Sequence, residues 1–258
     1  MALILNGTWE NSYGSTMVLN VDEEGFIFGE YSSHTGSTGT YLVIGHCRPS
    51  DPTDDLGQPL VLSIYWRSIG GEEPDEGSHW VSTYCGQLDK NGHMTVINSL
   101  VTTTSFQVFS PGDYIDKLMF TKQSSLNRLS AKNIALLAQP KVKLVNPING
   151  VWSDKEQGIE LSLFLQDQEY GVVNGWLSYD HELISMSGFT DILANNNILQ
   201  SVSLSGYMLE TSQPISLVGR INQDARVLVL SRWLANSTTA EEAYFQANSV
   251  NWELTKQQ

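Results

Sequence analysis

Short runs of alternating apolar and polar residues, separated by clusters of Gly, Asn, Asp and Pro, make up most of this chain. Such runs are typical of half-buried β-strands joined by turns. In the first half the pattern predicts eight strands, near residues 8–10, 15–20, 25–32, 40–47, 59–67, 78–88, 93–103 and 114–122. Eight strands in a simple meander favour a closed up-and-down barrel, because closure leaves no exposed sheet edge.

One segment has helical periodicity instead. In "SSLNRLSAKNIALLAQP" (124–140) the apolar residues recur at helical spacing, a serine can cap the start, and Pro140 ends the segment. The "KVKLVNP" that follows is interpreted as a linker. We therefore expect one short helix between two parts of the chain.

After this linker the pattern starts again. "NGTW" at 6–9 returns as "NGVW" at 149–152, "GQLDKNG" at 86–92 as "GRINQDA" at 219–225, and "FTK" at 120–122 as "LTK" at 254–256. Three landmarks in the same order indicate an internal duplication. The expected fold is all-β, with two tandem eight-stranded antiparallel up-and-down β-barrels at 1–123 and 148–258, joined by a helix-containing linker at 124–147.

Charge and composition exclude several classes of function. The chain has 258 residues with a net charge of −14, whereas nucleic acids and anionic membranes require clustered Lys and Arg, so neither is an expected partner. No run approaches the roughly 20 apolar residues of a membrane span. "MALILNGTWE" lacks the features of a signal peptide, so a cytoplasmic location is expected. Cys47 and Cys85 are expected to be free thiols, and the five histidines show no metal spacing, so neither a metal nor another cofactor is expected.

Five motifs in the first half carry a family resemblance. "NGTWENSYGS", "GEYSSHTG", "LSIYWRS", "TYCGQLDKNG" and "FTK" occur in this order and together resemble the avidin/streptavidin family of biotin-binding β-barrels, over about residues 6–122. The resemblance implies that Asn11, Ser15 and Tyr31 converge on the ureido oxygen of biotin, and that "HTGSTG" (34–39) closes over the ligand. An amide and two hydroxyls aimed at one carbonyl oxygen stabilise its partial negative charge.

The remainder of the expected pocket follows from the same resemblance. Its other lining residues are Ser33, Trp66, Trp80, Ser82, Tyr84, Leu100 and Leu118. The family has an Asp or Asn at the Leu118 position, which accepts a ureido N–H, and a Trp at the Leu100 position. Losing that acceptor is expected to weaken biotin binding by about one to two decades. Asp116 shares a strand face with Leu118 and is expected to be solvated at the barrel mouth.

The second half keeps the Trp of the first motif and loses the donors. Alignment of the repeats puts Asp154, Ile159, Trp176, Ser178, Trp233 and Trp252 at the positions of Asn11, Ser15, Tyr31, Ser33, Leu100 and Leu118. Aromatic residues thus replace polar ones, which indicates a plugged barrel or a pocket for an apolar ligand.

Two hypotheses of function stay open. In the first, the protein is a non-enzymatic binder of biotin or a related or apolar carbonyl compound. In the second, it is a cofactor-independent barrel enzyme, such as a biosynthetic cyclase or isomerase, that polarises a substrate carbonyl with Asn11, Ser15 and Tyr31. No catalytic residue is assigned, because no nucleophile motif frames any Ser. The duplication also predicts intramolecular pairing of the barrels, with a further homodimer as an open alternative.

Overall fold

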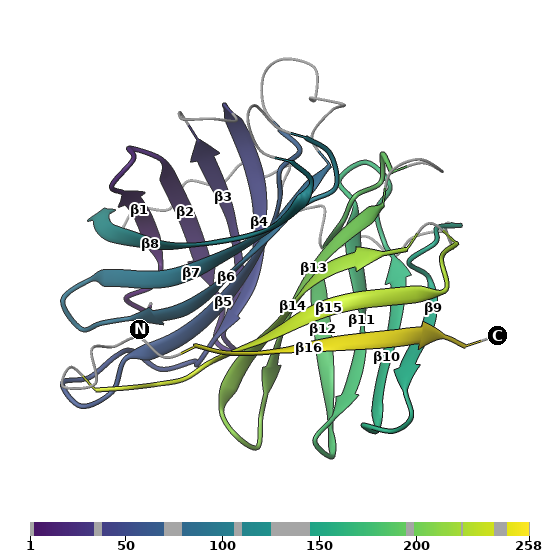
Figure 1. Cartoon of the computed structure of the whole chain (residues 1–258). Helices are drawn as coiled ribbons and strands as arrows, with labels where there is room; N and C mark the ends of the chain where they lie inside the picture. The colour runs from purple at the N-terminus through teal and green to yellow at the C-terminus, as the bar shows by residue number, and fades with distance from the viewer. Residues whose placement is uncertain are drawn as a thin grey trace.

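The protein consists of two closed barrels, each made of eight antiparallel strands in simple meander order (Figure 1). This computed structural model describes residues 3–33, 38–69, 79–105, 110–124, 145–194, 199–222, 224–239 and 247–257. The all-β prediction of two up-and-down barrels is confirmed.

The strand boundaries of the first barrel lie close to those expected from the hydrophobic pattern. The first barrel comprises β1 (Gly7–Asn11), β2 (Thr16–Val21), β3 (Phe26–Ser33), β4 (Gly39–Cys47), β5 (Gln58–Tyr65), β6 (Trp80–Leu88), β7 (His93–Thr102) and β8 (Gly112–Ser124). The second comprises β9 (Gly150–Asp154), β10 (Ile159–Leu165), β11 (Val172–Tyr179), β12 (Glu182–Thr190), β13 (Gln200–Met208), β14 (Gln213–Ile221), β15 (Val227–Ala235) and β16 (Ala247–Lys256).

The predicted helix at 124–140 lies outside the described residues, apart from Ser124, which is the last residue of β8. The described ranges contain no helix, so the helical linker stays a prediction. Within those ranges, no helix has the length and apolar character needed to cross a membrane.

A buried tryptophan occupies the same place in both barrels, at the end that we call the floor. Trp9 and Trp152 are both fully buried. The indole Nε1 of Trp9 donates to the Leu5 carbonyl at 2.9 Å, and that of Trp152 donates to the Ile148 carbonyl at 2.9 Å. The duplicated Gly-x-Trp motif therefore makes the same packing and the same hydrogen bond twice. The opposite end, where β1 and β9 finish, is the mouth of each barrel.

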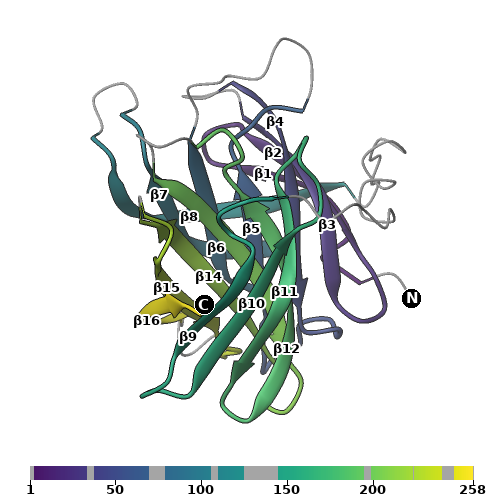
Figure 2. The same cartoon turned by 90° about the vertical axis from the view of Figure 1, so that its right-hand side faces the viewer.

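The barrels pack side by side, and each covers one outer wall of the other. Figure 2 shows β14 of the second barrel beside β5 and β6 of the first, in agreement with the contacts between these strands. Every residue of β5 and β6 is buried, because one face lines the first lumen and the other meets the second barrel. The apolar residues of this interface are Phe28, Leu42, Ile44, Val61, Tyr65, Val81, Cys85, Val101, Val172, Phe189, Val218, Trp233 and Ala235.

Polar contacts at the two ends of the interface show that the barrels run in opposite directions. Near the mouth of the first barrel, the Tyr65 hydroxyl donates to Asp191 Oδ1 at 3.0 Å, and His79 Nδ1 lies 2.6 Å from Asp191 Oδ2. Asp191 follows β12 at the floor of the second barrel. At the other end, Gln87 Nε2 donates to Thr238 Oγ1 at 2.6 Å. The mouth of each barrel thus lies beside the floor of its neighbour.

The two cysteines are free thiols, as expected. Cys47 packs in the first lumen, whereas Cys85 belongs to the interface. Burial raises the pKa of both thiols well above the ordinary range, so both stay protonated at neutral pH.

Candidate functional site

Asn11 and Ser15 close the β1–β2 turn at the mouth of the first barrel. Asn11 Oδ1 accepts hydrogen bonds from the backbone N–H groups of Tyr13 and Ser15, both at 3.0 Å. This turn chemistry fixes the orientation of the amide and leaves its NH₂ group to point inward, where Nδ2 donates to the Tyr31 hydroxyl at 3.2 Å. Asn11 is 5% exposed and Ser15 is 1% exposed. Asn11 is therefore both a turn residue and a lumen donor.

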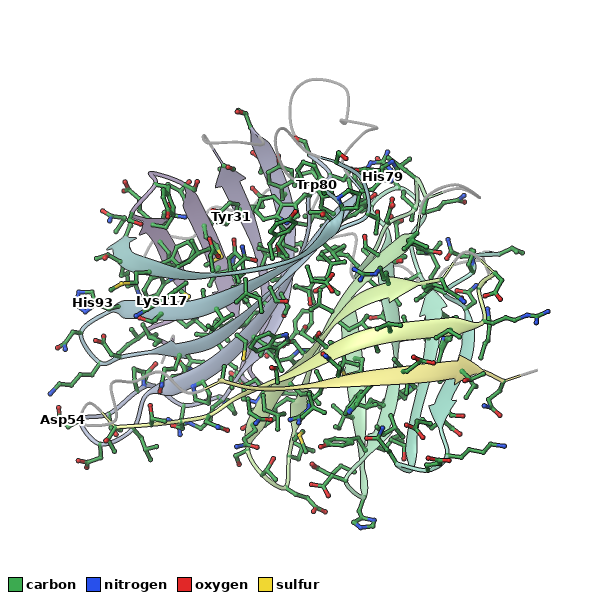
Figure 3. The ribbon with its side chains drawn as sticks, viewed as in Figure 1. Tyr31, Asp54, His79, Trp80, His93 and Lys117 are labelled. Atoms are coloured by element: carbon green, nitrogen blue, oxygen red, sulfur yellow. The ribbon has the colours of Figure 1, made fainter. Side chains whose placement is uncertain are left out.

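Tyr31 is the centre of this polar group (Figure 3). Its hydroxyl accepts from Asn11 and is hydrogen-bonded to Tyr84. The pKa of Tyr84 is raised well above its ordinary value, first by burial and then by Tyr31 and by the charge of Asp116. Because Asn11 donates to the Tyr31 oxygen, that bond does not use the Tyr31 proton. The Tyr31 proton remains available to a further acceptor.

Aromatic rings hold Tyr31 in place. Trp66 meets Tyr31 edge-on with ring centroids 5.5 Å apart, and it meets Tyr41 at 5.0 Å. The Trp66 Nε1 donates to Ser82 Oγ at 2.8 Å, which fixes the indole. Phe120 packs against Tyr31 at 6.4 Å. Because edge-to-face pairs of this kind add to ordinary apolar burial, the Tyr31 ring is rigidly positioned.

The structure brings the predicted residues of β6 to one face. Val81 and Cys85 belong to the barrel interface, so the alternating Trp80, Ser82 and Tyr84 belong to the opposite, lumen face. Trp80 lies at the mouth, where its Nε1 donates to Thr104 Oγ1 at 3.2 Å. Figure 3 shows it beside His79.

The other predicted lining residues also reach the lumen face. Leu100 is the direct cross-strand partner of Ser82. Leu118 belongs to the same apolar cluster as Tyr31, and Ser33 is buried at the end of β3. Residues 34–37 of the expected closing loop lie outside the described residues. The predicted lining residues are thus gathered around one end of one lumen.

Sequence reasoning placed Asp116 on the Leu118 face at the mouth, where it is exposed as expected, but missed its polar neighbour Asn98. They are direct cross-strand partners on β7 and β8, one layer nearer the mouth than Leu118, and their side chains are hydrogen-bonded. Partial burial raises the pKa of Asp116, and the bond from Asn98 opposes that rise. Asn98 Oδ1 is buried without a hydrogen-bond partner. The signal was present in the sequence, because Asn98 continues the alternation of the buried Met94 and Val96.

The expected position of Trp176 is wrong. It is 50% exposed, and the strand registers place Leu177 on the lumen face where Tyr31 stands in the first barrel. The connection between β10 and β11 spans 166–171, whereas that between β2 and β3 spans 22–25. The alignment of the repeats allowed for too few of these extra turn residues and was therefore one residue out at Trp176. Because side chains alternate along a strand, an error of one residue moves a side chain to the opposite face.

The expected position of Trp233 is wrong for the same reason. The β14–β15 connection (222–226) is one residue longer than the β6–β7 connection (89–92). Leu234 therefore takes the place of Leu100, and Trp233 turns outward into the barrel interface. Trp252 does lie in the second lumen, as predicted from the Leu118 position.

Comparison with protein families gives a match for the first barrel. The model of the Avidin family matches residues 2–107, which span β1 to β7. The match does not extend into the second barrel, which shares the meander of eight strands and the floor tryptophan. In the described part of the chain, no group of three or more His, Cys, Asp or Glu side chains is arranged to hold a metal ion.

Proposed function

We propose that the first barrel, an avidin-family barrel by its match over residues 2–107, binds a small organic molecule through a carbonyl or ureido oxygen and does not transform it. The observation that carries this proposal is the buried Asn11–Tyr31 pair, in which the Asn11 amide donates to the Tyr31 hydroxyl and leaves the Tyr31 proton for another acceptor. A buried donor without an acceptor costs about 1–3 kcal/mol. A ligand oxygen beside Tyr31 would recover that cost.

The acceptors on the opposite side of the lumen favour a ligand whose N–H groups lie near the mouth. In the avidin/streptavidin family, the ureido N–H groups of biotin lie deeper, at the position of Leu118. Leu118 provides no acceptor, whereas Asn98 Oδ1 and the Asp116 carboxylate lie one layer outward. A ligand with an acceptor oxygen at its inner end and N–H groups further out matches both polar groups. Biotin itself is then a weak ligand, because its ureido N–H groups would face Leu118.

Isothermal titration calorimetry of the full chain with biotin and desthiobiotin tests this proposal. Tyr31→Phe removes the hydroxyl and keeps the ring, so it should weaken binding by about tenfold or more. Tyr65→Phe is the matched control, since it removes a buried hydroxyl that faces the interface instead of the lumen. Binding that Tyr31→Phe leaves unchanged would place the ligand elsewhere. No heat and no thermal shift with either ligand, from folded protein, would remove biotin from consideration.

A cofactor-free cyclase or isomerase is the second candidate function, and Asp116 is the observation that favours it. Its carboxyl has a raised pKa and acts electrostatically on Tyr84, so a proton-transfer group lies near donors that can polarise a carbonyl. A ligand found by calorimetry should then exchange its α-hydrogens for deuterium when incubated with the protein in D₂O. NMR would detect the exchange, and Asp116→Asn should abolish it. A ligand recovered without exchange or rearrangement would exclude this function for that ligand.

A further inference from the structure

We propose that the second barrel has a ligand site of its own, in which Arg232 binds a small carboxylate with an apolar body. Arg232 lies in the middle of β15 and is 5% exposed. Its cross-strand partner Leu217 belongs to the apolar cluster of the second lumen, while its neighbour Trp233 turns to the interface. The guanidinium therefore extends from the lumen face of the strand.

The hydrogen-bonding capacity of this guanidinium is largely unused. Nη2 donates to Asn248 Oδ1 at 3.1 Å, whereas Nε and Nη1 are buried without a hydrogen-bond partner. No carboxylate of a described residue makes an ion pair with Arg232. An arginine stays charged at any physiological pH, and a buried charge without a counter-charge is strongly unfavourable. A bound anion would supply both the missing charge and the missing acceptors.

Two aromatic rings flank the charge and define the rest of the ligand. The guanidinium carbon lies 5.9 Å from the ring centroid of Tyr179 and 6.0 Å from that of Trp252. Below them the second lumen is filled by aliphatic side chains. An apolar or aromatic body attached to the anionic group would pack against these two rings, whose centroids lie 5.0 Å apart, whereas a small hydrated ion would gain no such contact.

A carboxylate fits the surroundings better than a phosphate does. Glu182 is the cross-strand partner of Tyr179 and shares its lumen face; its Oε1 accepts from the Glu210 N–H at 2.8 Å, and its Oε2 is buried without a partner. The Glu182 carboxylate would repel the second negative charge of a bound phosphate near the mouth. The net charge of −14 also gives no general attraction for anions, so any binding must come from the local guanidinium.

The site lies toward the mouth of the second barrel. Asn248 is exposed, Tyr179 is half-buried, and β11 is joined to β12 by a two-residue turn at Asp180 and His181. Arg232 occupies the ladder position that Asn98 occupies in the first barrel. The inference rests on residues of the second barrel alone, so it does not depend on the function proposed for the first.

Titration of the full chain at pH 7 with benzoate and hexanoate, each compared with its neutral amide, tests the proposal. Both acids should bind saturably, shift the NMR signal of the Arg232 Nε–H and change the fluorescence of the adjacent Trp252. The amides should bind at least about tenfold more weakly, because they cannot neutralise the guanidinium. Arg232→Gln should weaken acid binding by a similar factor. Arg226→Gln, which removes an exposed cation from the β14–β15 turn, should not.

Four results would overturn the proposal: equal binding of acid and amide, acid binding unchanged by Arg232→Gln, no acid binding by protein shown to be folded, or inorganic phosphate binding more tightly than benzoate. If circular dichroism shows that Arg232→Gln is unfolded, the Arg232 Nε–H signal of the wild-type protein tests the proposal instead. A signal that does not move at saturating benzoate would exclude Arg232 as the binding group.

Discussion

The two barrels share their construction and differ in the polar groups at the mouth-side end of the lumen. Both have a fully buried Trp on the floor, held by the same hydrogen bond. Toward the mouth, the first barrel has Asn11, Ser15 and Tyr31, whereas the second has Ile159 and Leu177 on the corresponding lumen positions and a buried Arg232. The floor closes the barrel and tolerates little change, while the mouth-side residues carry less of the packing and are free to diverge in chemistry.

The pairing of the barrels keeps their two mouths apart. Each barrel covers an outer wall of the other, and the antiparallel arrangement puts the two mouths at opposite ends of the molecule. Ligands would therefore enter from opposite ends and would not compete. The second barrel is at once a cover for the first and a candidate binding unit.

The largest expected effect is a loss of stability, and it tests whether the floor tryptophans of the two barrels contribute equally. Trp9→Ala and Trp152→Ala should each lower the free energy of unfolding by about 3–5 kcal/mol, because each removes a fully buried ring and leaves a cavity. Urea denaturation measures both. Trp176→Ala, at an exposed ring, should change stability by only about 0.5 kcal/mol. A loss below about 1 kcal/mol for one floor variant would show that the two floors are not equivalent.

The next effect concerns the contact between the barrels. Asp191→Ala should cost about 3 kcal/mol, because it leaves the buried His79 and Tyr65 without their shared acceptor. Asp113→Ala is the matched control: it also removes a cross-barrel ion pair, with Arg220, but an exposed one that contributes at most about 1 kcal/mol. Chemical denaturation of both variants gives the comparison. Equal losses would mean that the buried contact does not couple the barrels more strongly than the exposed one.

His46 also lies at the contact between the barrels, where its Nδ1 is 3.2 Å from Ser205 Oγ. We expect this histidine to make the free energy of unfolding depend on pH. Burial lowers its pKa from 6.5 to about 4, against an opposing effect of Asp22. Because the folded pKa is below the unfolded one, the unfolded chain takes up the proton first. The stabilisation is complete above pH 6.5 and is lost as the pH falls toward 4, by about 3 kcal/mol.

Unfolding midpoints at pH 7 and pH 4.5 check this effect. His46→Gln should reduce the difference between the two midpoints, whereas His93→Gln, at an exposed side chain, should leave it as in the wild type. The same pH difference in all three proteins would assign the acid sensitivity to other groups.

The smallest expected effect concerns Leu118, where the first barrel differs from the avidin/streptavidin family that it resembles. Leu118→Asn restores an acceptor at the position where the family has an Asp or Asn. It should raise biotin affinity by about tenfold, or about 1.4 kcal/mol, with some loss of stability from the buried amide. Calorimetry of this variant and of Leu118→Met measures the change. Weaker binding in Leu118→Asn than in Leu118→Met would argue against a ureido N–H at this position.

Much of the fold was predictable because strands have a local pattern. Alternation and turn residues placed the eight strands of the first barrel, the repeated landmarks implied a second barrel of eight, and the motif around Asn11 and Tyr31 located the polar end of the first lumen. The errors concerned which face of a strand two tryptophans occupy. Trp176 and Trp233 were assigned to the lumen because turns of different length shift the register by one residue, which no strand pattern reveals when both faces carry apolar residues.

The amino-acid sequence by itself determined that this protein is a duplicated barrel, that its two halves share a floor, and that only the first half has the Asn, Ser and Tyr donors. Those properties depend on the order of residues along single strands. Tertiary structure decided which buried face meets the other barrel, that Asp191 joins His79 and Tyr65, and that Asn98 and Arg232 face a lumen. Those properties depend on closure and packing, which bring together residues far apart in the chain.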